Sequence, residues 1–263
     1  MDLGIKDRVA LVTGASAGLG FATAHTLAGE GARVVINSRS EENLKKAAEK
    51  INKDTGYTPP YFAGDLADDG FAEKMVSDIT GRIGTIDILV SNAGGPPPGE
   101  FMKHDKDTWK KSADLTLHSA INLTRAVLPD MKKNKWGRII YITSIAVKQP
   151  VDGLIISNAL RAGLTGFAKT ISNEFAKFGI TINTVCPGYT RTERLTNLAQ
   201  NISQTSGISI DDVYKNWTDS IPAGRLGEPD ELGGLITFLA SEKAAYISGS
   251  AILVDGGAYK GLL

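Results

Sequence analysis

The sequence predicts an α/β fold, a single Rossmann-type doubly wound parallel sheet with helices on both faces. Short apolar runs alternate with longer stretches of helical periodicity along the whole chain, which is the pattern of a parallel sheet built from βαβ units. The runs are apolar on both faces, as strands covered by helices on both sides should be. A glycine-rich turn joins the first run to the first helical stretch.

Seven runs are expected to form the strands. They span residues 8–14, 32–38, 58–66, 87–92, 137–144, 180–188 and 250–257. Most are rich in valine and isoleucine, whose branched side chains pack well on a pleated surface. The run at 58–66 is the weakest, because its prolines cannot donate hydrogen bonds to a strand ladder.

The stretches between these runs have the periodicity and the ends of helices. Residues 21–31 are amphipathic and close at Gly31, a residue type that often ends helices because it accepts a left-handed backbone. Residues 40–56 open on a serine followed by acidic residues, as helices commonly do, and residues 228–241 form a further helix. No linker, repeat or low-complexity tract interrupts the alternation, so residues 1–263 are expected to form one domain.

Composition and charge exclude several classes of protein. The 263 residues include 29 basic and 29 acidic side chains, so no net charge favours nucleic acid or an anionic membrane as a partner. The single cysteine, Cys186, excludes an internal disulfide framework and suits a reducing compartment. No signal peptide and no stretch of membrane-spanning length is recognised. We therefore expect a cytoplasmic protein that binds neither nucleic acid nor membrane.

The glycine-rich turn has the composition of a phosphate-binding turn. Gly14, Gly18 and Gly20 follow the spacing G-x-x-x-G-x-G between a strand and a helix. Glycines there let the backbone turn tightly and approach a pyrophosphate, and the helix N-terminus offers unpaired N–H groups. The turn predicts that the chain is a single NAD(P)-binding Rossmann domain.

The end of the second strand indicates which nicotinamide cofactor is preferred. An NAD site of this type has Asp or Glu there, to bind the ribose 2′-hydroxyl. This chain has the neutral Asn37 and Ser38, followed by Arg39. An arginine can bind a 2′-phosphate by charge-assisted hydrogen bonds, so NADP is expected and NAD is less favoured. The alternative role of Arg39 is a solvated charge at a strand end.

Several separated motifs resemble the short-chain dehydrogenase/reductase family over almost the whole chain. They are TGASAGLG (13–20), GDL (64–66), SNAG (91–94), CPGYTRT (186–192) and the segment 224–257. The last segment is similar to 3-oxoacyl carrier-protein reductases and sugar dehydrogenases. The resemblance implies cofactor contacts from Gly14, Ser16, Gly18, Leu19, Gly20, Ser38, Arg39, Asp65, Leu66, Asn92, Ala93, Gly94, Arg161, Pro187, Gly188, Thr190 and Thr192.

The chain departs from the family in its catalytic group. Members generally use an Asn, a Ser and a Tyr-x-x-x-Lys pair, in which the Tyr transfers the proton and the Lys lowers its pKa and holds the nicotinamide ribose. Carried over position by position, Ser144 keeps the Ser place. The Tyr place is Ser157, the Lys place is Arg161 and the Asn place is Thr116. The chain therefore resembles an atypical member that lacks the Tyr-x-x-x-Lys pair.

These replacements change the chemistry of proton transfer. The pKa of a phenol can be tuned towards working pH by a neighbouring cation, whereas that of an aliphatic hydroxyl cannot. Serine also reaches roughly 4 Å less far than tyrosine, by ordinary bond lengths. Ser157 therefore cannot protonate the same carbonyl directly, although a water could fill the vacated space. Arg161 keeps the positive charge of the family lysine with a different geometry.

Other residues could line the substrate site. Lys148 lies in a loop that should border the nicotinamide. It could act as an acid or as an electrostatic stabiliser, or it could be merely an exposed lysine. Asp152 could pair with Lys148 or cap the next helix. Residues 191–221 occupy the place of the family's substrate lid and supply apolar side chains that could cover a substrate. No cluster of metal ligands is recognised, and the resemblance implies a homotetramer or homodimer.

Three functions remain open at this stage. The first is an NADP-preferring oxidoreductase whose substrate is a small molecule with a carbonyl or alcohol group. The second is a catalytically impaired protein that binds the nucleotide as a sensor or structural ligand. The third is a non-redox enzyme, such as a lyase or isomerase, on the same scaffold. The intact cofactor motifs favour the first.

Overall fold

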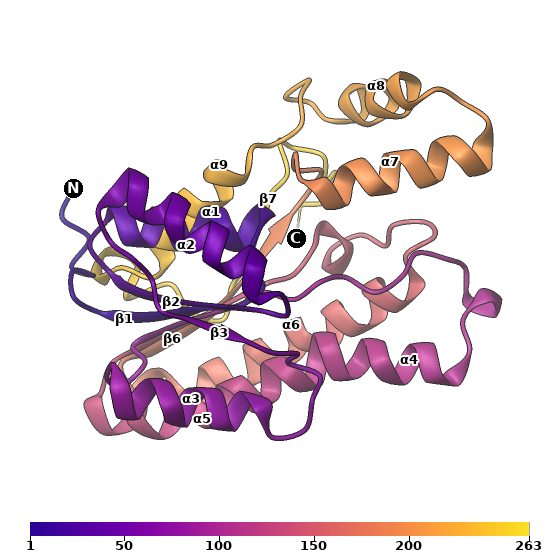
Figure 1. Cartoon of the computed structure of the whole chain (residues 1–263). Helices are drawn as coiled ribbons and strands as arrows, with labels where there is room; N and C mark the ends of the chain where they lie inside the picture. The colour runs from indigo at the N-terminus through magenta and orange to yellow at the C-terminus, as the bar shows by residue number, and fades with distance from the viewer. Residues whose placement is uncertain (263) are drawn as a thin grey trace.

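The computed structural model describes residues 1–262 and builds them around a seven-stranded parallel sheet with the order β3-β2-β1-β4-β5-β6-β7 (Figure 1). The strands are β1 (Val9–Val12), β2 (Arg33–Ser38), β3 (Tyr61–Ala63), β4 (Ile88–Ser91), β5 (Gly137–Ile142), β6 (Ile180–Pro187) and β7 (Ala251–Val254). Each predicted run contains one of them, which confirms the doubly wound sheet. The strands are shorter than predicted, because the ends of the apolar runs bend into the turns that follow.

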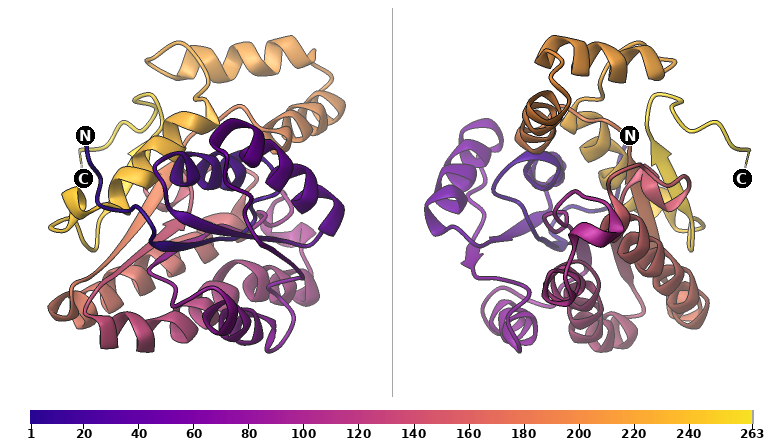
Figure 2. Two further views of the ribbon diagram at one scale, coloured as in Figure 1. Left: turned by 60° about the vertical axis from the view of Figure 1, so that its left-hand side comes forward. Right: turned by 90° about the vertical axis from the view of Figure 1, so that its right-hand side faces the viewer.

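Helices cover both faces of the sheet, as the views in Figure 2 show. One face carries α1 (Gly18–Gly29), α2 (Glu41–Thr55) and α9 (Pro229–Leu239), whose buried leucines and alanines pack in one cluster with β1, β2 and β4. The other face carries α3 (Phe71–Arg82), α5 (Ser119–Asn134) and α6 (Ile155–Phe175), which bury a second apolar cluster. These two cores hold the sheet rigid between helical layers.

The predicted helix ends have clear physical causes. The Ser40 hydroxyl accepts a hydrogen bond from the Asn43 N–H at the start of α2, which is the expected serine cap. Gly56 ends α2 with a left-handed backbone at φ 76°. Helix α9 begins with a capping box in which Glu228 and Glu231 each bind the other's backbone N–H.

The sheet order places a switch point between β1 and β4. Strand β1 pairs with β2 on one side and with β4 on the other, so the chain leaves β1 in opposite directions to build the two halves of the sheet. Ligands of such sheets bind in the crevice beyond the carboxyl ends of the strands at this point.

Two segments extend over the carboxyl ends of the strands. Helix α4 (Lys106–Ala113) runs through one π-helical turn (Asp114–His118) into α5. Helices α7 (Glu193–Ser206) and α8 (Ile210–Ser220) form a separate layer beside the sheet (Figure 1). Their apolar faces meet in a third cluster that contains Leu195, Val213 and Trp217. The segment at 191–221 is therefore a helical hairpin.

Candidate active site

The glycine-rich turn leaves β1 with a backbone that only glycine adopts without strain. Gly14 and Gly18 have φ values of 58° and 56°. A Cβ on Gly20 would lie 2.2 Å from the Gly14 carbonyl oxygen, so helix α1 can approach the turn only because Gly20 has no side chain. Ala17 precedes α1 and provides no side-chain cap. The first N–H groups of α1 therefore remain available to an anion.

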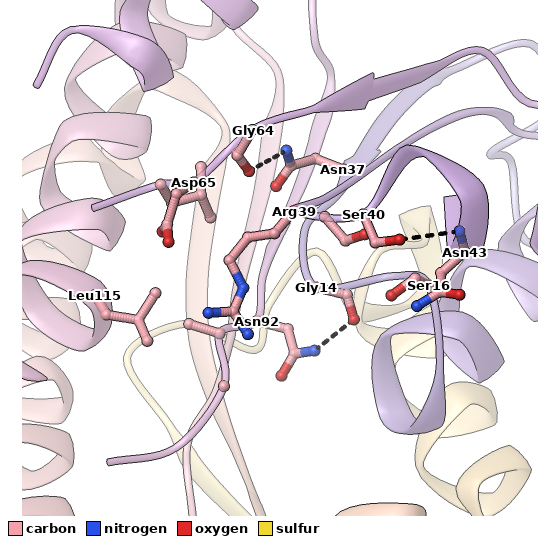
Figure 3. Close-up of a pocket in the computed structure, with 14 residues that line it drawn as sticks. Gly14, Ser16, Asn37, Arg39, Ser40, Asn43, Gly64, Asp65, Asn92 and Leu115 are labelled. Atoms are coloured by element: carbon pink, nitrogen blue, oxygen red, sulfur yellow. Dashed lines mark hydrogen bonds between the residues drawn. The ribbon is translucent and has the colours of Figure 1, made fainter. Parts of the chain in front are cut away.

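A cavity of about 280 Å³ opens beside this turn at the switch point (Figure 3). Of the predicted cofactor residues, its lining includes Gly14, Ser16, Ser38, Arg39, Asp65, Leu66, Asn92, Ala93 and Gly94. Asn37, Ser40, Asn43, Gly64 and Leu115 also line it, and the sequence reasoning did not assign them to the cofactor. Residues from β1, β2, β3 and β4 thus meet at one place, which suits the adenosine half of a dinucleotide.

The end of β2 has the polar groups that a 2′-phosphate needs. The Asn37 side chain is buried and donates hydrogen bonds to the carbonyls of Phe62 and Gly64 at 2.9 and 3.4 Å, so it joins β2 to β3. The Ser38 hydroxyl is buried without a hydrogen-bond partner in the described structure. The Arg39 guanidinium extends into the cavity (Figure 3) and forms no ion pair among residues 1–262. An unpaired hydroxyl beside an unpaired cation fits a phosphate.

Asn92 ties the SNAG turn to the glycine turn. Its side-chain amide donates to the Gly14 carbonyl at 3.2 Å. Its backbone is bound in both directions by the Thr13 hydroxyl, at 2.8 and 2.9 Å. These hydrogen bonds fix the SNAG turn and the glycine-rich turn relative to each other, which the linear motif alone does not reveal.

The Pro-Gly turn after β6 approaches the glycine turn from the other side. The Gly188 N–H donates to Val254 on β7, and Thr190 forms a bridge with Gly227. Thr192 caps α7 by accepting a hydrogen bond from the Leu195 N–H at 3.3 Å. Its methyl group lies 3.4 Å from where a Gly18 Cβ would stand. The start of α7 therefore lies against the glycine-rich turn.

Ser157 and Arg161 lie on α6 one turn apart and are buried, so their side chains share one face of the helix. The Arg161 guanidinium donates to the Ile142 carbonyl at the end of β5, at 2.9 Å. Burial, assisted by the nearby cation of Arg194, lowers the pKa of Arg161 to about 10. Arg161 is therefore a desolvated cation that is still protonated near neutral pH.

Ser144 and Thr116 surround the same helix. Ser144 precedes a short 3-10 turn and accepts a hydrogen bond from the Ala146 N–H at 3.1 Å. Thr116 lies in the π-helical turn, and its hydroxyl is buried with no partner in the part of the chain that the structure describes. The π-helical turn packs against α6. The Thr116 hydroxyl is thus left free to bind water or a ligand.

Lys148 follows the 3-10 turn and is partly buried. Lys148 lies near Cys186. Burial raises the pKa of the Cys186 thiol, and the positive charges of Lys148 and Arg161 oppose this effect in part. Within residues 1–262, Lys148 forms no ion pair with Asp152 or any other carboxylate, and α6 begins after Leu154 without a side-chain cap. Both roles considered for Asp152 are therefore wrong.

Arg194 is the residue that the sequence reasoning missed. It stands in the first turn of α7, and its guanidinium packs directly on the Gly95 backbone, where a Cβ would lie 2.0 Å from Nη2. Desolvation lowers its pKa. The only local signal was an arginine two residues after the helix cap Thr192, and its direction depends on how α7 enters the site.

The aromatic residues of the lid pack on one another. Tyr189, which follows the Pro-Gly turn, stacks on Trp217 with 4.9 Å between ring centroids. Burial raises the pKa of its phenol, which makes it a weaker acid. No group of three potential metal ligands occurs among the described residues, and none of their helices is long and apolar enough to cross a membrane.

Comparisons with known proteins match the chain along almost its full length. A family model described as "Enoyl-(Acyl carrier protein) reductase" matches residues 14–259. Nodulation protein G of Azospirillum brasilense is 36% identical over 255 residues, which cover 96% of this chain and 98% of the relative. The 3-oxoacyl-[acyl-carrier-protein] reductase FabG of Escherichia coli strain K12 is 35% identical over 257 residues, with coverage of 98% and 99%.

Solved structures agree with this chain in fold and size. L-Sorbose reductase from Gluconobacter frateurii, in complex with NADPH and L-sorbose, has a TM-score of 0.94 and 33% identity, with 100% of both chains covered. YwfH, an NADPH-dependent reductase involved in bacilysin biosynthesis, has a TM-score of 0.92 and 30% identity, with coverage of 98% of this chain and 100% of that one.

Proposed function

We propose that this chain, which belongs to the short-chain dehydrogenase/reductase family, is an NADP-dependent oxidoreductase that interconverts a carbonyl compound and its alcohol with an altered catalytic group. The observation that carries the proposal is the buried cation of Arg161 on the face of α6 that also holds Ser157. We call this face the catalytic wall. The motifs expected to bind the cofactor are all present around it, and only the group expected to transfer the proton differs from that of the family.

The chain provides a matching group for each part of NADP. The N-terminus of α1 and the glycine turn hold the pyrophosphate, and Arg39 with Ser38 holds the 2′-phosphate. Arg161, in the place of the family lysine, lies where the nicotinamide ribose is expected. NADPH, when bound, supplies the hydride that adds to the carbonyl carbon. The similar structure of L-sorbose reductase holds NADPH, and YwfH is an NADPH-dependent reductase, which supports this choice of cofactor.

The catalytic group stabilises the product oxygen before a proton reaches it. As the carbonyl carbon gains the hydride, the π electron pair moves to the oxygen, and Arg161 and Ser144 stabilise this developing alkoxide. Water in the space left by the shorter Ser157 side chain then donates the proton, and the hydroxide that remains is neutralised by solvent. Thr116, whose hydroxyl has no partner among residues 1–262, can orient this water.

Replacement of Arg39 by alanine is expected to weaken NADPH binding at least about tenfold and to leave NADH binding within about twofold. A charge-assisted hydrogen bond to the 2′-phosphate accounts for this difference. Fluorescence titration with both nucleotides measures it. Arg33→Ala is the matched control, because Arg33 also lies on β2 but donates to the Ile83 carbonyl. Equal losses for both nucleotides would contradict the assignment of Arg39.

The pH profile of reduction is expected to be flat between about pH 6 and 9. No phenol titrates in the proposed group, and Arg161 has a pKa lowered only to about 10, so it stays protonated over this range. Above pH 10 it loses its proton and with it the charge that stabilises the alkoxide, so the rate should fall. Steady-state rates at saturating NADPH check this. An inflection between pH 6 and 9 would contradict the proposed catalytic group, because it would require a different acid.

The proposed function is tested by NADPH and NADH titration, followed by single-turnover oxidation of NADPH with a panel of ketones, aldehydes and oxo acids. Substrate-dependent oxidation supports the proposal. Tight binding without oxidation favours the nucleotide-binding sensor, especially if the double variant Ser157→Tyr and Arg161→Lys gains activity that the natural chain lacks. Conversion of a substrate with no change in the nicotinamide would indicate the non-redox enzyme.

The same proposal includes an assembly and a location. Strand β7 is an edge of the sheet whose four residues are all partly exposed, and the Tyr246 side chain is fully exposed. Such an edge and an exposed aromatic side chain suit a homotetramer or homodimer. We place the enzyme in the cytoplasm, because its one cysteine is a free, buried thiol. Helices α7 and α8 serve as the lid over a small-molecule substrate.

A further inference from the structure

Three basic side chains lie around the proposed catalytic wall without an acidic partner. They are Arg161, Arg194 and Lys148. Arg161 donates to a neutral carbonyl, and neither Arg194 nor Lys148 forms a side-chain hydrogen bond or ion pair with any of residues 1–262. The neighbouring Arg191, just before α7, is paired, since it binds the Glu228 carboxylate at 2.9 Å. A ligand that carries negative charge would complete this group of cations.

Arg194 has no evident role in stability. It lies in the first turn of α7, where the partial positive charge of the helix end disfavours a cation. Its guanidinium has exchanged water for contact with the Gly95 backbone, which lowers its pKa, while the residue as a whole remains open to solvent. An unpaired and accessible guanidinium at a site edge is typical of a binding group rather than a structural one.

The backbone beside Arg194 favours a carboxylate over a phosphate. Gly95 is followed by Pro96, Pro97 and Pro98, which have no N–H groups. Phosphate sites usually surround their ligand with several backbone N–H donors, and this stretch cannot supply them. A planar guanidinium, in contrast, binds a planar carboxylate through two parallel hydrogen bonds without such help.

We propose that the substrate carries a carboxylate close to its reducible carbonyl, and that Arg194, seated on Gly95, binds this carboxylate while Arg161 faces the carbonyl oxygen. The site is then specific for oxo acids or, in the reverse direction, hydroxy acids. This substrate class rests on the oxidoreductase function proposed above. Lys148 adds positive potential at the same end of the cleft and is not assigned a direct contact.

The anion bound by Arg194 could instead be the pyrophosphate of the cofactor, because Thr192 on the same turn lies against Gly18. Two features favour the substrate. Arg194 packs on Gly95, beyond the residues that the turn after β4 contributes to the adenosine cavity, which end with Gly94. Arg194 also lies close enough to Arg161 to lower its pKa, and Arg161 is at the catalytic wall. The experiment separates the two sources.

Binding is tested without turnover, on the full chain saturated with NADP⁺, by isothermal titration calorimetry. The probes are two matched pairs, oxamate against oxamide and phenylacetate against phenylacetamide, in which only the carboxylate distinguishes the members. At least one carboxylate should bind about tenfold or more tightly than its amide. In Arg194→Gln this preference should fall to within about twofold, while the Kd for NADPH stays within about twofold.

Two further variants control for folding and for general charge. Gly95→Ala should also remove the preference, because its methyl group would take the place of the guanidinium, and the far end of an arginine side chain can move aside at little cost to the fold. Arg191→Gln removes a cation three residues from Arg194 that is already paired with Glu228, and should keep the full preference.

The possible results separate this inference from the proposed function. A carboxylate preference that depends on Arg194, without NADPH oxidation by any oxo acid, upholds the anionic site and rejects the oxidoreductase. NADPH oxidation with phenylpyruvate and its methyl ester at equal kcat/KM upholds the oxidoreductase and overturns the inference. The inference is also overturned if neither carboxylate is preferred over its amide, or if Arg194→Gln mainly weakens NADPH binding.

Discussion

Replacement of Arg161 by methionine is expected to reduce kcat/KM for NADPH-dependent reduction by at least about 100-fold, the loss typical of removing one group that stabilises a developing oxyanion. Arg161 is 8% exposed and has no carboxylate partner, so its charge acts in a site with little water, where electrostatic effects are strong. Steady-state kinetics with the best carbonyl substrate measure the loss. Arg161→Lys keeps the charge and should retain most of the activity.

The Arg161→Met variant is expected to be at least as thermally stable as the natural protein. Burial lowers the pKa of Arg161 from 12.5 to about 10, so the folded chain holds this proton less tightly than the unfolded chain does. The charge therefore costs the fold on the order of 3 kcal/mol at every pH below about 10. Methionine removes that cost and fills much of the space, which offsets the roughly 1–3 kcal/mol lost when the Ile142 carbonyl is left without its hydrogen bond.

The melting temperatures of Arg161→Met and of the natural protein, measured by calorimetry, test this effect on stability. The surface variant Arg82→Met serves as the control, because Arg82 is exposed at the end of α3 and should change neither activity nor stability. A large loss of stability in Arg161→Met together with nearly normal activity would show that Arg161 is a structural residue, and it would contradict the proposed catalytic group.

Replacement of Gly20 by alanine is expected to weaken NADPH binding at least about 100-fold. The added Cβ would lie 2.2 Å from the Gly14 carbonyl oxygen and 2.9 Å from the Asn92 side-chain nitrogen. Neither the backbone oxygen nor the Asn92 amide, which is itself bonded to Gly14, can move without opening the turn. The phosphate-binding N–H groups would lose their alignment, and the overpacking should cost about 1–3 kcal/mol of stability.

A matched control lies at the other end of the same helix. No atom stands within 4 Å of a Cβ built on Gly29, so Gly29→Ala should bind NADPH normally and be slightly more stable, as alanine favours a helix. Nucleotide titration and denaturant unfolding of both variants make the comparison. Normal NADPH affinity in Gly20→Ala would show that the turn does not hold the cofactor.

Local patterns predict a large part of this protein because they act through the neighbouring backbone. Apolar runs of strand length indicate all seven strands, even the weak one at 61–63. The glycine spacing indicates a turn whose left-handed φ values at Gly14 and Gly18 confirm the reasoning. The neutral end of β2 followed by Arg39 predicts a preference for NADP, because an arginine without a nearby carboxylate suits a 2′-phosphate better than a 2′-hydroxyl.

The sequence by itself determined the doubly wound sheet and the glycine-rich turn, and it carries the prediction that Ser157 and Arg161 stand at the family's Tyr and Lys places, since each of these depends on residues close together in the chain. Only the tertiary structure decided that Arg194 meets Gly95, that Asn37 joins β2 to β3 and that Thr116 has a free hydroxyl. These contacts join residues from different elements. They depend on the strand order and on the angle at which α7 leaves the Pro-Gly turn, which packing sets and local periodicity does not encode.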